Sequence, residues 1–266
     1  MMDAGLRGKS ALVTGGGTGI GRAIALALAD AGANVALASN QPAEETIRKL
    51  KSHGVRASFI SADVSIEADV QRMVDKAASQ LGSIDLYVNN AAIADHQPVT
   101  RISADAWHRT LNTNLSACVF ACREICKLMI AQGGGSILII GSTAQYNQAY
   151  GEASYHIAKA GLRTYKNTLA LEMAPHGIRV NMLVPGHFLT PLTEGIGDES
   201  ASILRGEIPL RRFGGPQELT ATALLLLSDR LSPYTTGAEF VVDGGLSLRP
   251  LPLVTDEQIL LMNRGE

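Results

Sequence analysis

The chain has 266 residues, 46% of them hydrophobic and 18% charged, which excludes a disordered chain because such a chain lacks the apolar residues for a core. Its 23 basic and 25 acidic side chains leave a net charge of -2, so there is no basic excess to bind nucleic acid. No apolar run approaches the roughly 18 residues of a membrane span, and glycines interrupt the first residues before a signal peptide could form. We therefore expect a cytoplasmic protein with no membrane or nucleic-acid partner.

Short apolar runs alternate with longer amphipathic runs along the chain. The short runs predict seven strands, at residues 10–14, 34–38, 56–60, 83–88, 135–140, 178–183 and 238–243. The amphipathic runs predict helices between them, at residues 20–32, 42–54, 65–82, 103–132, 153–176 and 216–229. A glycine closes most of these helices, at Gly32, Gly54, Gly82, Gly133 and Gly177.

This alternation predicts parallel strands joined by right-handed crossovers, with helices on both faces of the sheet. The expected fold is a doubly wound, Rossmann-type α/β sheet of about seven strands, in a single domain over residues 1–266. Two segments do not fit the alternation. Residues 187–215 are predicted to form a lid beyond the end of a strand, and residues 246–266 a tail that docks on the lid or on a neighbouring subunit.

The three cysteines recur every four residues, at Cys118, Cys122 and Cys126. On a helix the outer two lie about 12 Å apart along the axis, too far to bind one metal ion. Because the run around them is apolar at helical spacing, we expect them to pack in the core, and we expect no metal site.

The first predicted strand leads into TGGGTGIG, residues 14–21, which opens the first helix. Gly15 permits a sharp turn, Gly19 lets the backbone approach a pyrophosphate, and Gly21 lets the helix pack closely on the strand. The free N–H groups at the start of a helix bind phosphate groups. In this context the loop predicts a dinucleotide-binding site.

The spacing TGxxxGxG resembles that of the short-chain dehydrogenase/reductase family in its compact form, and further motifs match that family over residues 6–248. These are NNAA at 89–92 (NNAG in the family), Asn114 in NTNLS, Ser142 thirteen residues before Tyr155, the YxxxK motif from Tyr155 to Lys159, and PGxxxT from Pro185 to Thr190. The resemblance implies the catalytic residues Asn114, Ser142, Tyr155 and Lys159. It also implies a cofactor site formed by Gly15, Gly17, Thr18, Gly19, Ile20, Gly21, Ser39, Asn40, Asp63, Val64, Asn90, Ala91, Tyr155, Lys159, Pro185, Gly186 and Thr190.

Tyr155 and Lys159 are four residues apart, so on a helix their side chains point to the same side. An ammonium about 4 Å from a phenolate stabilises it by about 4 kcal/mol at an effective dielectric of about 20. This predicts that the pKa of Tyr155 falls from about 10 toward about 7, where a general acid–base operates well. The resemblance implies that Tyr155 exchanges the proton of the substrate oxygen and that Ser142 orients this oxygen. It further implies that Lys159 holds the nicotinamide ribose and that Asn114 anchors a water.

The choice between NAD and NADP depends on the turn after the second strand. An acidic residue there would bind the ribose hydroxyls and repel a 2′-phosphate, but the turn reads Ala38, Ser39, Asn40, Gln41. No arginine is present in this turn to bind the phosphate either. The sequence predicts an NAD(P) cofactor and slightly favours NADP.

The substrate is expected to be a secondary alcohol or its ketone, with a sugar or polyol as the first interpretation. Polar residues after Ser142 and in the lid favour this, namely Gln145, Tyr146, Gln148, Tyr150, Glu152, His187, Glu194, Asp198 and Glu199. The alternatives are a 3-oxoacyl thioester reductase, or a non-catalytic protein that senses nucleotides on the same fold. No role is assigned to His96 or His156.

The helices at 103–132 and 153–176 carry apolar residues over more than one face, and a second apolar face needs a partner. We expect a homotetramer, or a homodimer, assembled through these two helices, as is usual in the family that the sequence resembles.

Overall fold

A computed structural model describes residues 3–194 and 197–248. Its centre is one sheet of seven parallel strands in the order β3-β2-β1-β4-β5-β6-β7, which confirms the predicted doubly wound fold. The strands are β1 (Ser10–Thr14), β2 (Asn34–Ser39), β3 (Ala57–Ser61), β4 (Leu86–Asn89), β5 (Gly135–Ile140), β6 (Ile178–Pro185) and β7 (Glu239–Val242). Every one of them lies where the sequence predicts a strand.

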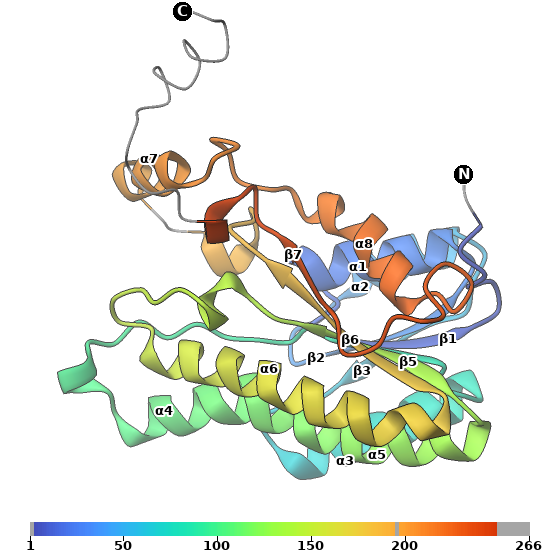
Figure 1. Cartoon of the computed structure of the whole chain (residues 1–266). Helices are drawn as coiled ribbons and strands as arrows, with labels where there is room; N and C mark the ends of the chain where they lie inside the picture. Colours follow the sequence, from blue (N-terminus) through green and yellow to red (C-terminus); the bar gives the residue numbers. More distant parts are fainter. Residues whose placement is uncertain (1–2, 195–196, 249–266) are drawn as a thin grey trace, which may run out of the picture.

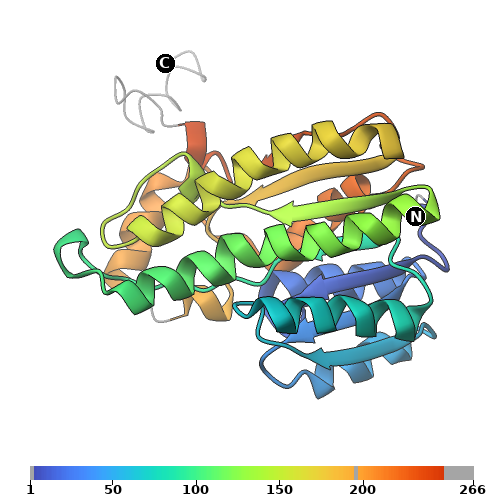
Figure 2. The ribbon, with the colours of Figure 1, turned by 90° about the horizontal axis from the view of Figure 1, so that it is seen from below.

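Helices cover both faces of this sheet (Figures 1 and 2). One layer holds α1 (Gly19–Asp30), α2 (Glu44–Ser52) and α8 (Thr220–Leu227), and the other holds α3 (Glu67–Leu81), α4 (Ala104–Leu111), α5 (Ala117–Gln132) and α6 (Ala153–Met173). Successive residues of a strand point to opposite faces of the sheet. Leu12 therefore packs in the core beneath α3 and α5, whereas Ala11 and Val13 pack in the core beneath α1, α2 and α8. This burial on both faces explains why the strands read as continuous apolar runs.

The helix predicted over residues 103–132 is interrupted in its first half. A π-helical turn, Asn112–Ser116, separates α4 from α5, and its wider bonding is seen in the hydrogen bond from the Ala117 N–H to the Asn112 carbonyl. After this turn α5 presents Cys118, Cys122 and Cys126 to the core, where all three are buried, as the packing prediction requires.

The other predicted helices are found with small changes at their ends. Short 3-10 turns extend α6 over Ala174–His176 and precede α8 over Pro216–Leu219. The predicted lid contains one more helix, α7 (Asp198–Glu207). Each helix-closing glycine has a positive φ, between 70° and 87°, at Gly32, Gly54, Gly82, Gly133 and Gly177. Within the described residues no helix is both long enough and apolar enough to cross a membrane.

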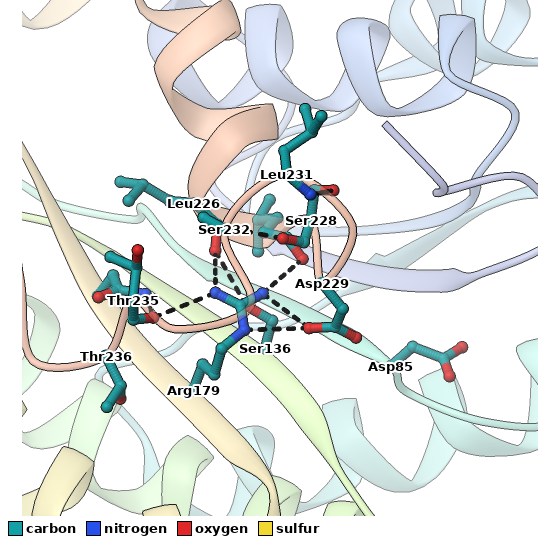
Figure 3. Close-up of polar contacts among 12 residues, drawn as sticks. Asp85, Ser136, Arg179, Leu226, Ser228, Asp229, Leu231, Ser232, Thr235 and Thr236 are labelled. Atoms are coloured by element: carbon teal, nitrogen blue, oxygen red, sulfur yellow. Dashed lines mark hydrogen bonds and ion pairs between the residues drawn. The ribbon is translucent and has the colours of Figure 1, made fainter. Parts of the chain in front are cut away.

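The last turn of α8 is held by a buried arginine from the sheet (Figure 3). The guanidinium of Arg179, on β6, donates to the carbonyls of Leu226 and Leu227 at 2.8 and 3.2 Å, and to that of Thr235 at 3.3 Å. It also pairs with the Asp229 carboxylate at 2.8 Å. The last carbonyls of a helix have no partner within it and carry partial negative charge, so a cation here supplies both hydrogen bonds and charge.

We predict that Arg179→Met lowers the free energy of unfolding by about 3 kcal/mol, because buried carbonyls lose a charged donor. Asp229→Asn should cost less than about 1 kcal/mol, since the Asp229 side chain is 63% exposed and water replaces its partner. Urea denaturation of both variants measures the two values. An equal loss in both would mean that the ion pair, rather than the helix cap, supplies the stability.

Candidate active site

The glycine loop joins the end of β1 to the start of α1. Gly15 has a φ of 63°, and a Cβ on Gly21 would lie 2.4 Å from both the Gly15 carbonyl oxygen and the Asn90 side-chain nitrogen. Neither position therefore accepts a side chain without a shift of the backbone. In the described residues no acidic side chain lies in the first turn of α1, and the Thr18 side chain does not cap it. The loop leaves the N–H groups of this turn open to an anionic ligand.

Hydrogen bonds tie this loop to the end of β4. The Asn90 side-chain amide donates to the carbonyls of Thr14 and Gly15 at 3.0 and 3.1 Å. In return the Thr14 hydroxyl accepts the backbone N–H groups of Asn90 and Ala91 at 3.0 and 3.2 Å. The loop and the NNAA segment therefore form one rigid unit between the two strands.

The ends of β2 and β3 lie along the same edge of the sheet. The Ser39 hydroxyl accepts the N–H of Gln41 at 3.1 Å, and Asn40 is exposed. The Asp63 carboxylate accepts both the N–H and the hydroxyl of Ser65, at 2.9 and 2.7 Å. Val64 beside it is buried. The turn after β2 therefore carries no charge, and the Asp63 carboxylate after β3 is held in one orientation.

Three predicted catalytic side chains come together where β5 ends and α6 begins. Ser142 follows β5, and it lies close enough to Tyr155, near the start of α6, to lower the pKa of that phenol. One turn later the Lys159 ammonium lies 5.6 Å from the centre of the Tyr155 ring and donates to the Ile140 carbonyl at 2.9 Å. The tyrosine and lysine share one side of the helix, as their spacing predicts.

The pKa of Tyr155 differs from the prediction made from this spacing. Burial raises the pKa of Tyr155 to about 12; the hydrogen bond from Ser142 lowers this pKa, and the nearby Glu152 carboxylate raises it further. Burial also lowers the pKa of Lys159 to about 8. The expected fall toward about 7 is thus not seen in the cofactor-free protein, because the loss of hydration opposes the charged form of both groups. Tyr155 is a protonated phenol at neutral pH.

The fourth predicted catalytic residue, Asn114, lies in the π-helical turn and is buried. Its side-chain amide donates to the Ile93 carbonyl and accepts the Ile93 N–H, both at 2.8 Å. Asn114 therefore fixes the chain just beyond β4, and within the part of the chain that the structure describes its side-chain hydrogen bonds go to Ile93 rather than to Lys159. π-Helical turns are frequent at functional sites.

A cavity of about 1170 Å³ opens at this edge of the sheet, which is larger than the about 300–1000 Å³ of most ligand pockets. The predicted site residues that line it are Ile20, Asn90, Ser142, Tyr155, Lys159, Pro185, Gly186 and Thr190. Those that do not line it directly are Gly15, Gly17, Thr18, Gly19, Gly21, Ser39, Asn40, Asp63, Val64, Ala91 and Asn114. The predicted lid contributes Leu192, Leu204, Glu207 and Arg211 among others, and the start of the predicted tail contributes Leu246 and Leu248. Residues 195–196 of the lid and 249–266 of the tail lie outside the described residues.

The polar residues proposed for the substrate divide into two groups. Gln148, Glu152 and His187 line the cavity. Gln145 and Tyr146 instead turn to β7, where the Glu239 carboxylate accepts a hydrogen bond from each. The remaining four, Tyr150, Glu194, Asp198 and Glu199, are exposed and do not line the cavity.

Sequence reasoning missed His156, which lines the cavity next to Tyr155. Its Nδ1 lies 2.7 Å from the Ala144 carbonyl, and its Nε2 accepts the Ala149 N–H at 3.0 Å. The imidazole thus holds both ends of the turn that follows Ser142. No sequence signal could have revealed this role, since both of its partners are backbone groups.

Comparison with known proteins agrees with this geometry. Residues 15–247 match a family model described as enoyl-(acyl carrier protein) reductase. A short chain dehydrogenase/reductase from Aspergillus oryzae, astE, is 40% identical over 91% of this chain and 96% of its own length. The 3-oxoacyl-[acyl-carrier-protein] reductase FabG of Staphylococcus epidermidis is 36% identical over 90% of this chain and 98% of its own. A structure described as an NAD(P)-dependent gluconate 5-dehydrogenase from Beutenbergia cavernae, with bound NADP at low occupancy, is 31% identical with a TM-score of 0.88, over 92% and 99% of the two chains.

We predict that Lys159→Met changes the pH dependence of stability. Burial lowers the Lys159 pKa from 10.5 to about 8, so the folded wild type holds fewer protons than the unfolded chain between these pH values. Wild-type stability therefore rises between about pH 8 and 10.5, and the stability of the variant relative to wild type is greatest below pH 8 and falls above it.

Urea denaturation of the cofactor-free protein from pH 7 to 10.5 measures this difference. Lys127→Met removes a lysine of α5 that is 66% exposed, and it is the control that shows how stability changes with pH when a surface lysine is lost. A difference between Lys159→Met and wild type that stays constant with pH would show that the buried amine costs the fold nothing.

Proposed function

We propose a reaction for this chain from the family to which it belongs. The family model and the two relatives show that this is the short-chain dehydrogenase/reductase family. It is an oxidoreductase of that family. The proposed reaction interconverts a secondary alcohol and a ketone with an NAD(P) cofactor. The observation that carries the proposal is the meeting of Ser142, Tyr155 and Lys159 at the wall of a single cavity, at the same sheet edge as the glycine loop.

The proposed roles follow from the protonation states and contacts of these residues. As a protonated phenol, Tyr155 donates a proton to a ketone oxygen in reduction, and in oxidation it takes the hydroxyl proton back. Ser142 bonds both Tyr155 and the substrate oxygen, and so orients the oxygen. Lys159 supplies positive charge beside the phenol and polar contact to the cofactor ribose. Asn114 holds the chain after β4 in place and, as proposed from the resemblance, anchors a water.

The residues present fit a dinucleotide. A Cβ atom at Gly15 or Gly21 would collide with neighbouring atoms, so the tight turn requires glycine at both positions. The open N–H groups at the start of α1 suit a pyrophosphate. When bound, the nicotinamide accepts or supplies the hydride. We assign the cofactor to the glycine loop with Gly17, Thr18, Gly19 and Ile20, to Ser39 and Asn40, to Asp63 and Val64, to Asn90 and Ala91, to Tyr155 and Lys159, and to Pro185, Gly186 and Thr190.

A sugar or polyol is the substrate class that we propose first. Gln148, Glu152 and His187 offer hydrogen bonds within the cavity, and the similar Beutenbergia protein is described as a gluconate dehydrogenase. The second candidate is a 3-oxoacyl thioester, which the name of the Staphylococcus relative supports. A nucleotide sensor without turnover is disfavoured, because the tyrosine and the lysine are both present.

Two further expectations remain proposals. Residues 187–215 would act as a lid over the single domain, since His187, Leu204 and Arg211 of this segment line the cavity. Assembly into a homotetramer or homodimer through α5 and α6 is supported by apolar side chains on their surface. Leu171 is 78% exposed, and Ile157 and Ile130 are 48% and 40% exposed.

We predict that Tyr155→Phe lowers kcat by about 10²- to 10⁴-fold, because it removes the proton donor and leaves the ring in place. Tyr150→Phe is the matched control and should leave kcat unchanged, since Tyr150 is fully exposed outside the cavity. The absorbance of reduced nicotinamide is followed with polyols, sugars, secondary alcohols and 3-oxoacyl thioesters. Full activity in Tyr155→Phe would rule out the proposed reaction.

We predict that Ser39→Asp shifts cofactor preference toward NAD by at least about tenfold in the ratio of kcat/KM values. A carboxylate at the end of β2 would bind the ribose hydroxyls and repel a 2′-phosphate. Ser79→Asp places the same charge on the exposed surface of α3 and serves as the control. An unchanged ratio in Ser39→Asp would show that the cofactor ribose does not lie at this turn.

A further inference from the structure

The Glu152 carboxylate lines the same cavity as the reacting tyrosine. Glu152 directly precedes α6, so it sits one helical turn before Tyr155. Its side chain is 23% exposed and lines the cavity together with His187. Its negative charge raises the pKa of both Tyr155 and His187. A helix N-terminus favours a negative charge at this position.

Two histidines approach this carboxylate, but one of them cannot neutralise it. The Glu152 Oε2 atom lies 3.5 Å from Nε2 of His156. That nitrogen already accepts the Ala149 N–H at 3.0 Å, so it carries no proton, and the proton sits on Nδ1, which donates to the Ala144 carbonyl at 2.7 Å. His156 is therefore neutral in this arrangement, and the contact is not an ion pair.

The second histidine gives only a loose contact. Nδ1 of His96 lies 3.4 Å from Glu152 Oε1, on a side chain that is 65% exposed to water. In the part of the chain that the structure describes, the Glu152 side chain accepts no hydrogen bond. The cavity thus holds a carboxylate with free acceptor positions beside the reacting phenol.

From this we infer that Glu152 determines specificity by accepting a hydrogen bond from a hydroxyl group next to the reacting carbon. The ligand class is a neutral α-hydroxy ketone or the corresponding vicinal diol. A ketone without this hydroxyl leaves the carboxylate unpaired, and a substrate with its own carboxylate near the carbonyl is repelled by it. The inference rests on the proposed alcohol–ketone reaction at Tyr155 and narrows its substrate class.

Neighbouring residues support this geometry. His187 is partly buried, and burial lowers its pKa, so at neutral pH it is an uncharged hydrogen-bonding group and does not offset the charge of Glu152. Arg211 lines the same cavity, but it comes from the predicted lid rather than from the start of α6, and it donates to the Gly206 carbonyl.

The test compares three four-carbon ketones with the cofactor-loaded enzyme: acetoin, butan-2-one and acetoacetate. We expect the wild type to prefer acetoin. Glu152→Gln should lower kcat/KM for acetoin about tenfold, change butan-2-one by less than about twofold, and raise acetoacetate. Glu67→Gln, which removes the same charge from the surface of α3, is the matched control and should change none of the three values.

A second readout separates this inference from the proposed reaction. Calorimetric titration of the cofactor-loaded protein with acetoin and with acetoacetate measures the same preference without turnover, and Tyr155→Phe is assayed in parallel. If Tyr155→Phe keeps full turnover, or if the wild type reduces no ketone, the proposed reaction fails, and the titration alone decides the role of Glu152. An acetoin preference that Glu152→Gln reduces about tenfold supports the inference. An unchanged preference, equal binding of the two probes, or an equal loss for all three ketones overturns it.

Discussion

The hydrogen bonds between the ends of β1 and β4 are the constraint on which the site depends. In the strand order the chain runs outward from β1 through β2 to β3, and outward from β4 through β5 and β6 to β7. The connections after β1 and β4 therefore leave in opposite directions, and a crevice opens between them. The Asn90 amide satisfies the loop carbonyls at this point and lies so close that Gly21 can carry no side chain. Ile20 at the end of the glycine loop and Tyr155 and Lys159 on α6 consequently line one cavity.

The fold could be predicted from the sequence because burial on both faces of the sheet leaves a direct trace. The runs that form β1 and β5 contain unbroken apolar stretches, at 11–13 and 137–140, and a helix-closing glycine marks where several helices end. The π-helical turn between α4 and α5 leaves no such trace. Glycine and proline are absent from NTNLS, so the segment reads as part of one continuous helix.

The site was predictable only in part. Motif residues such as Ser142 and Tyr155 lie together because their positions follow from the strand and helix that carry them. The direction of side chains in the turn after Ser142 could not be foreseen. Tyr146 points to Glu239, more than ninety residues away, and no local pattern pairs the two. His156 binds only backbone groups, whose positions depend on the folded turn.

The ionisation of Tyr155 and Lys159 shows a related limit. Residue spacing gives the separation of two charges, but hydration depends on every atom packed around them. Here burial disfavours the charged form of each group, which raises the pKa of Tyr155 and lowers the pKa of Lys159. Electrostatics inferred from spacing alone therefore had the wrong sign for Tyr155.

The π-helical turn also limits how sequences with this fold can change in length. Each residue advances an α-helix by about 100° around its axis. A π-helical turn holds one residue more than an α-helical turn, so deleting one residue from Asn112–Ser116 would leave a regular helix that keeps the buried cysteine face in the core and moves Asn114 relative to Ile93, whereas an added residue would turn α5 by that angle. Substitutions can accumulate along these helices, but an insertion or deletion there would break one contact or the other. Insertions and deletions are therefore expected in surface connections, such as the one between β6 and α8, rather than in this helical segment.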